Sequence, residues 1–179
     1  MDDDVRGEVT GFDTALGFTM TRADGDGVEG CMLVAPSMHQ PYGIVHGGVW
    51  CSVVETAASI GGAMWFGDRG HVVGVSNHTN FLRAVREGVL AVRAVPVQRG
   101  RTQQLWTVTI TDAAGRDVVK GDVRLANLPS ADLLAAGPAQ GAQPALAALA
   151  ALAAQPALAA QPAGSAGSPR APGPPTVPP

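Results

Sequence analysis

Glu55 is the only charged residue between His46 and Gly67, within the otherwise apolar or small-residue run HGGVWCSVVETAASIGGAMWFG. A carboxylate in a buried segment costs several kcal/mol unless it is paired or hydrated. We therefore interpret Glu55 as a catalytic carboxylate, acting on a carbonyl substrate. The structural alternative is a buried salt bridge to an arginine across a dimer.

The His46-Gly47-Gly48 sequence opens the same run and suggests an oxyanion site. Glycines let a backbone approach a ligand closely, and the first N–H groups of a helix have no partner within it. Together with the helix dipole, these groups can polarise a carbonyl oxygen. Glu55 follows Gly47 by about 12 Å along an ideal helix, so an extended ester or thioester would meet both groups if the chain bends at the glycines.

The surrounding elements predict an α+β protein. Residues 47–66 form one long apolar helix, and the flanking segments are rich in Val, Thr and Ile and separated by turn signals. Short turns favour antiparallel pairing, and a long apolar helix among such strands implies a curved antiparallel sheet wrapped around it. The expected strands are residues 17–22, 28–36, 71–81, 88–97, 102–111 and 117–126, the first two forming a hairpin around ADGDG.

Composition limits the function classes. The chain has 179 residues, a formal net charge of -3 and two cysteines, which favours one domain, no nucleic-acid partner and a reducing cytoplasm. A membrane-spanning helix at residues 47–66 is disfavoured by the central Glu55 and four glycines. The four histidines and two cysteines lack metal-binding spacing and no phosphate-binding glycine loop is present, so we expect no metal and no cofactor.

The sequence changes character after residue 128. Residues 129–179 are rich in Ala, Pro, Gln and Gly, and AQPALAA occurs twice, at residues 142–148 and 154–160. Such composition is typical of a low-complexity segment. We expect residues 1–128 to be the folded domain and residues 129–179 to be a disordered or weakly helical tail.

Several motifs together resemble a known family. They are Gln40, His46-Gly47-Gly48, Glu55, Ser59, the segment SNHTNFLRAV and the segment GRTQQLW at residues 100–106. This combination resembles the hotdog-fold acyl-CoA thioesterases of the PaaI type, including the 4-hydroxybenzoyl-CoA and enterobactin proofreading branches, over roughly residues 14–127. The resemblance implies dimers with joined sheets, often paired into homotetramers, with active sites between subunits.

The resemblance also implies roles for individual residues. Glu55 would be the nucleophile or the general base for water, Gly47 would polarise the thioester carbonyl, and Gln40 and His46 would assist by hydrogen bonding. Ser59, one turn beyond Glu55, would hold the attacking water or orient the carboxylate. The predicted substrate contacts are Gly48, Asn80, Phe81 and Arg101.

Structural roles remain open for several of these residues. His46 and Gln40 could satisfy backbone groups of the loop before the helix, and Ser59 could bond to a carbonyl one turn earlier. Among the arginines at positions 83, 86, 99 and 101, we favour Arg101 as the contact to coenzyme A phosphates. The family pattern E-x-N-x-x-x-x-R-P is only partly present, because Ser76, His78 and Ala84 replace three of its residues, and either His78 or Phe81 would line the acyl pocket.

We therefore expect hydrolysis of a small or aromatic acyl thioester of coenzyme A or of an acyl-carrier protein. A non-catalytic acyl-CoA-binding module with a regulatory tail is the alternative. A hotdog dehydratase or hydratase using His46 and Glu55 is a third possibility, for which no further motif is present.

Overall fold

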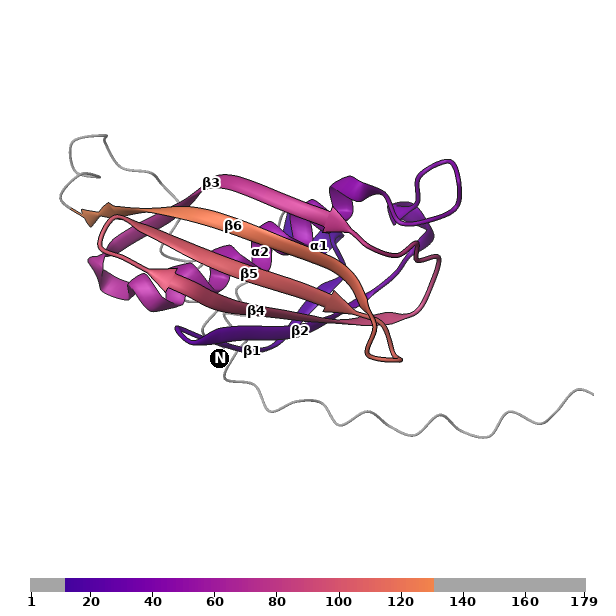
Figure 1. Ribbon diagram of the computed structural model, residues 1–179, viewed down its shortest axis with the longest axis horizontal. Helices are drawn as coiled ribbons and strands as arrows, with labels where there is room; N and C mark the ends of the chain where they lie inside the picture. The colour runs from indigo at the N-terminus through magenta and orange to yellow at the C-terminus, as the bar shows by residue number, and fades with distance from the viewer. Residues whose placement is uncertain (1–11, 131–179) are drawn as a thin grey trace, which may run out of the picture.

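The computed structural model describes residues 12–130 and contains one long helix and six strands (Figure 1). Residues 131–179 of the predicted tail and the segment before residue 12 lie outside the described residues. The elements in chain order are α1 (Phe12–Ala15), β1 (Phe18–Asp24), β2 (Gly27–Leu33), the 3-10 turn η1 (Pro36–Met38), α2 (Gly47–Phe66), the 3-10 turn η2 (Gly67–Arg69), β3 (Gly70–Phe81), β4 (Val89–Arg99), β5 (Gln103–Thr111) and β6 (Asp117–Pro129).

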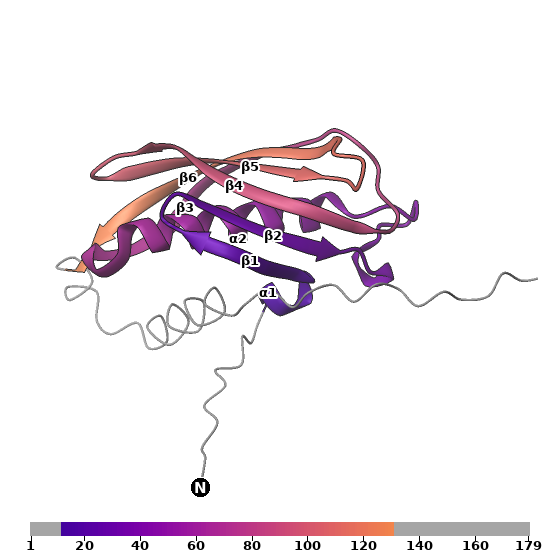
Figure 2. The same cartoon turned by 90° about the horizontal axis from the view of Figure 1, so that it is seen from below.

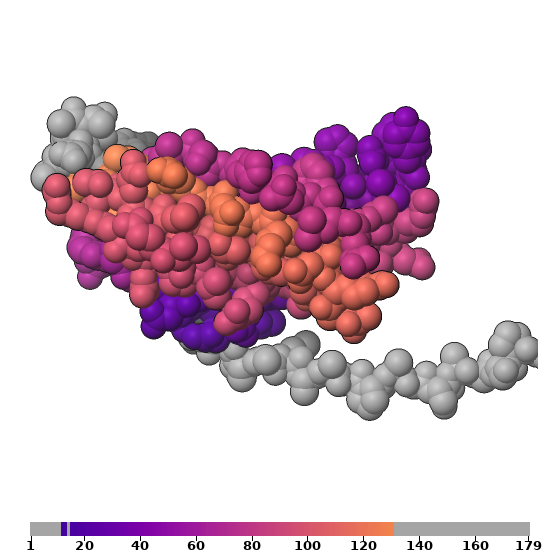
Figure 3. Space-filling model, viewed as in Figure 1, coloured from indigo at the N-terminus to yellow at the C-terminus, as the bar shows by residue number. Residues whose placement is uncertain are grey.

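The six strands form one antiparallel sheet in the order β1-β2-β4-β5-β6-β3. The sheet curves over α2, which lies along its concave face (Figure 2). The predicted hotdog architecture is confirmed. The opposite face of β4, β5 and β6 forms a broad surface with β3 along its border (Figure 3). The strand order makes β1 and β3 the two edge strands.

The boundaries of the first hairpin are set by Asp24. Its Oδ1 accepts the N–H groups of Asp26 and Gly27 at 2.8 and 2.9 Å, which closes a turn of two residues, Gly25 and Asp26, between β1 and β2. These bonds stabilise the ionised carboxylate, and the N–H of Asp26 is the largest cause of the lowered pKa of Asp24. The predicted hairpin is therefore present, with a tighter turn than ADGDG suggested.

Helix α2 packs on the sheet through residues that lack bulk. A Cβ on Gly61 would lie 2.6 Å from the ring of Trp106, and one on Gly62 would lie 2.3 Å from Leu125. These distances are shorter than any ordinary contact, so only glycine permits this close approach of helix and sheet. The helix ends at Gly67, whose φ of 55° is accessible to glycine without strain.

One side of α2 is less buried than its sequence suggests. Val53, Val54, Ala57 and Ala58 are fully buried against the sheet, whereas a stripe at helical spacing remains half-buried, comprising Cys51, Ser52, Glu55, Thr56 and Ser59. Glu55 thus lies on the partly open side of the helix and not at its most buried position. No helix within residues 12–130 is both long and apolar enough to cross a membrane.

Candidate active site

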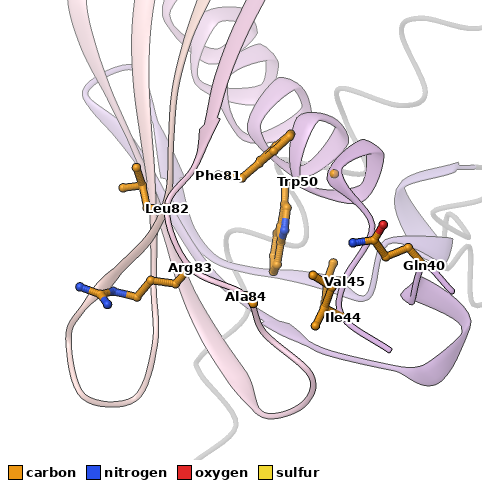
Figure 4. Close-up of a pocket in the computed structure, with 9 residues that line it drawn as sticks. Gln40, Ile44, Val45, Trp50, Phe81, Leu82, Arg83 and Ala84 are labelled. Carbon is orange, nitrogen blue, oxygen red and sulfur yellow. The ribbon is translucent and has the colours of Figure 1, made fainter. Parts of the chain in front are cut away.

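A cavity of about 260 Å³ opens beside the first turn of α2. Its wall is mostly apolar, and its lining residues are Gln40, Ile44, Val45, Gly47, Trp50, Phe81, Leu82, Arg83 and Ala84. Figure 4 shows Trp50 and Phe81 together on one side, with Gln40 beyond Ile44 and Val45. The guanidinium of Arg83 extends away from these rings, so Arg83 borders the cavity through its backbone and stem.

Gln40 is held at this cavity by a tight turn. Its backbone N–H donates to the carbonyl of Ile44 and its own carbonyl accepts from Gly43, both at 2.9 Å. The Nη1 of Arg86 donates to the carbonyls of Tyr42 and Gly43 at 3.1 and 3.0 Å. Arg86 therefore fixes the turn that carries Gln40, and its guanidinium is used by the protein itself.

His46 caps α2. Its Nδ1 accepts the backbone N–H of Gly48 at 2.9 Å, one of the helix-start donors that lack an intrahelical partner. The structural role considered for His46 is therefore present. Within residues 12–130 the N–H of Gly47 has no acceptor, so it remains available to a carbonyl oxygen in the cavity.

The bend at the glycines, which Gly47 and Glu55 of one chain would need in order to reach one thioester together, is absent. Helix α2 runs without interruption from Gly47 to Phe66, so Gly47 and Glu55 remain about 12 Å apart along the axis. A nucleophile must approach a carbonyl carbon within about 3–3.5 Å, and an oxyanion donor lies about 2.7–3.1 Å from the oxygen. The Glu55 carboxylate is directed at Asn77 of β3, whereas the start of α2 faces Phe81, four residues further along that strand. The two groups of one chain therefore do not converge on one carbonyl.

Glu55 contacts strand β3 directly. Its Oε2 accepts a hydrogen bond from Asn77 Nδ2 at 3.0 Å, and its Oε1 occupies the space beside Gly74, where a Cβ would lie 2.1 Å away. No lysine, arginine or histidine of the described residues forms an ion pair with Glu55. Within the described residues of one copy, the carboxylate is thus held by an amide and not by a cation.

The contacts of β3 decide which of its residues face the helix. A Cβ on Gly47 would meet the ring of Phe81 at 2.8 Å, so this ring covers the start of α2. His78 and Asn80 alternate with Asn77, Thr79 and Phe81 and are exposed on the other face. Phe81 therefore lines the cavity, whereas His78 and the predicted substrate contact Asn80 point away from it.

The remaining predicted residues lie apart from the cavity. Arg101 is exposed in the turn between β4 and β5, close to Gln104, whose side chain donates to the carbonyl of Gly62. Gly62 is roughly 22 Å along α2 from Gly47, so Arg101 is not brought to the cavity of its own chain. Ser59 lies one turn beyond Glu55 on the half-buried stripe.

Sequence reasoning missed Gly74, Asn77 and Thr79. The signal available was the presence of glycine and asparagine inside a strand, where both residue types are unfavourable.

No group of three or more His, Cys, Asp or Glu side chains within residues 12–130 is arranged to hold a metal ion.

Comparison with known proteins assigns the family. Residues 42–119 match the model of the thioesterase superfamily. The Mycobacterium tuberculosis protein Rv1847 is 45% identical over 120 residues, covering 65% of this chain and 86% of the relative. The proofreading thioesterase EntH of Cronobacter sakazakii is 36% identical over 101 residues, covering 56% of this chain and 74% of the relative.

A solved structure agrees. AziG of S. sahachiroi superimposes with a TM-score of 0.67 at 46% identity, over 68% of this chain and 99% of AziG. The fold and the site define a hotdog enzyme with a carboxylate on its central helix. The chain belongs to the thioesterase superfamily and is a thioester hydrolase.

Proposed function

We propose that the protein is an acyl-CoA thioesterase of the PaaI type that hydrolyses small or aromatic acyl thioesters, with Glu55 as the reacting carboxylate. The observation that carries this proposal is the placement of Glu55 on the half-buried side of α2, bound by Asn77 and without a cation from the described residues. A carboxylate held in this way is available as a nucleophile or as a base.

The cavity beside α2 supports a small acyl group. Its volume of about 260 Å³ lies below the roughly 300–1,000 Å³ of sites for drug-sized ligands. The aromatic rings of Trp50 and Phe81 offer faces against which a planar acyl group can pack. A long aliphatic chain would exceed this space.

Two copies of the chain would complete each site. The separation of Gly47 from Glu55 supports a site in which the carboxylate and the oxyanion donor for one thioester come from different copies. Strand β3 offers 12 residues of edge backbone for antiparallel pairing with a second β3, which would set the two α2 helices antiparallel and bring the start of one toward the middle of the other. We propose a homodimer as the functional unit, with pairing into homotetramers.

The chemistry has two forms. In one, a Glu55 oxygen attacks the thioester carbon, the C–S bond breaks to release the thiolate, and water hydrolyses the resulting anhydride. In the other, Glu55 takes a proton from water, which attacks the carbon directly, and the C–S bond then breaks to release the thiolate, which takes up a proton. In both, the N–H of Gly47 would stabilise the oxyanion, with Gln40 beside it and Ser59 near the carboxylate. Cys31 and Cys51 are free thiols, which is consistent with a protein that works in the reducing cytoplasm.

The test is thiol release from a panel of aliphatic and aromatic acyl-CoAs, followed with a thiol-reactive dye. Replacement Glu55→Gln should lower kcat by about 10²–10⁴-fold, because the amide can neither attack nor take the proton. Glu87→Gln is the matched control, since Glu87 is exposed in the loop after β3. Near-normal kcat in Glu55→Gln would refute the proposal. The same assay with acyl-carrier-protein thioesters would show which carrier of the acyl group is preferred. The mass of the protein in solution, measured by light scattering, would give the number of copies in the oligomer.

A further inference from the structure

Strand β3 contains an irregularity opposite Glu55. The pairing register between β3 and β6 shifts between Gly74 and Ser76, which leaves Val75 as a bulge. Regular alternation from Gly74 would turn Ser76 and His78 toward α2. Because the bulge adds one residue, Asn77 and Thr79 face the helix in their place.

The amide of Asn77 spans one turn of α2. Its Nδ2 donates to Glu55 Oε2 at 3.0 Å and to the backbone carbonyl of Cys51 at 2.9 Å. Cys51 and Glu55 are four residues apart and so share one face of the helix. A primary amide has two N–H donors, and both are used here on acceptors one turn apart.

Thr79 binds the oxygen of that amide. Its Oγ1 donates to Asn77 Oδ1 at 2.6 Å. If the amide turned over, its oxygen would face the Cys51 carbonyl and the Glu55 carboxylate, both of which are acceptors, and its nitrogen would face the Thr79 hydroxyl. The Cys51 carbonyl and the Glu55 carboxylate therefore select the orientation with the N–H groups directed at the helix. The Thr79 hydroxyl, which can donate or accept, holds the amide oxygen in place.

We infer that Asn77, held in place by Thr79, is a positioning residue for Glu55, an inference that rests on the proposed function of that carboxylate. The amide holds Oε2 in place. Oε1 accepts no hydrogen bond from a described residue and lies close to Gly74, whose lack of a side chain leaves room for it. Oε1 is thus the oxygen presented to the thioester or to water, and Asn77 sets its direction without touching the substrate.

This arrangement differs from a mere structural tie between β3 and α2. A tie would change the free energy of unfolding when it is removed. A positioning contact changes kcat, because a carboxylate displaced by about 1 Å from its productive geometry can lose about 10²-fold in rate. It also acts equally on all substrates, since it lies outside the acyl cavity.

The experiment compares Thr79→Val, Thr79→Ser and Asn77→Ala by steady-state kinetics on one aliphatic and one aromatic acyl-CoA, with thermal unfolding of each variant. Loss of a hydrogen bond to a charged group corresponds to about 10- to 100-fold, so kcat of Asn77→Ala should fall by that factor. Valine matches threonine in shape but lacks the hydroxyl, so Thr79→Val should lose about 3- to 10-fold. Serine retains the donor and should restore most of the rate.

The expected pattern is lower kcat with KM and melting temperature close to wild type, by the same factor for both substrates. The inference is overturned if Asn77→Ala and Thr79→Val keep kcat within about twofold, or if their losses follow the loss of melting temperature and Thr79→Ser fails to restore the rate. Glu55→Gln separates the two proposals. If that variant is inactive while the β3 variants are unaffected, only the positioning role fails, whereas an active Glu55→Gln removes both.

Discussion

Replacement of Gly74 by alanine tests how closely the Glu55 carboxylate is fitted to β3. The added Cβ would lie 2.1 Å from Glu55 Oε1, whereas ordinary van der Waals contact begins at 3.4 Å. The difference requires the carboxylate or the strand to move by about 1.3 Å. Since a displacement of about 1 Å at a reacting group can cost about 10²-fold, we expect kcat of Gly74→Ala to fall by about that factor.

The same substitution should have little effect on folding. Oε1 is the far end of a flexible side chain on the half-buried face of α2, so it can move without disturbing the buried core. Alanine also restricts the unfolded chain more than glycine, which offsets part of any strain. The melting temperature should therefore stay close to that of the wild type.

The assay is thiol release at saturating and limiting acyl-CoA, together with thermal unfolding. Ser76→Ala is the matched control, because Ser76 is exposed on the opposite face of the same strand. If Gly74→Ala retained the wild-type kcat while Ser76→Ala did too, the fit of Oε1 against β3 would have no catalytic importance. If Gly74→Ala lost both rate and melting temperature, Gly74 would be required for folding.

Two further predictions concern the cavity and the core. Phe81→Ala should raise KM for an aromatic acyl-CoA by about 10-fold, because the contact between the two rings is lost. KM for a short aliphatic acyl-CoA should change less. Equal changes of KM for both substrates would argue against Phe81 as a wall of the acyl site. Gln104→Leu should lower the free energy of unfolding, measured in urea, by about 2–4 kcal/mol. The fully buried Gln104 accepts a hydrogen bond from Trp106 Nε1 at 2.8 Å and donates one to Asn127 Oδ1 at 2.7 Å, so its loss leaves both buried groups unpaired. An unchanged free energy of unfolding would contradict this prediction.

Much of the fold followed from local patterns. The six strands and the long helix were predictable because segments rich in Val, Thr and Ile alternate with strong turn signals. The boundaries differ by a few residues: β6, expected at residues 117–126, extends to Pro129. The exposure of Glu55 was not predictable in the same way. It depends on which side of α2 the sheet covers, and a helix with apolar or small residues on all sides carries little information about that.

The candidate site was predictable where it depends on chain neighbours and not where it depends on register. His46 next to Gly48 indicated a helix cap, and the cap is present. Asn77 was not indicated, because strict alternation in a strand without a bulge would place it on the opposite face from Gly74. One extra residue at Val75 reverses that assignment, and no residue type in VVGVSNHTNF identifies the position of the bulge.

The local costs in β3 gather at one place. Gly74 and Asn77 are poor strand formers, and the bulge between them interrupts the hydrogen bonds to β6. Each feature alone would weaken an edge strand, yet each is used by the same carboxylate: Gly74 gives room to Oε1, the bulge turns Asn77 inward, and Asn77 binds Oε2. Natural sequences depart from local preferences mainly at functional sites. The convergence of three such departures on Glu55 is therefore a stronger argument for its catalytic use than its apolar sequence neighbours alone.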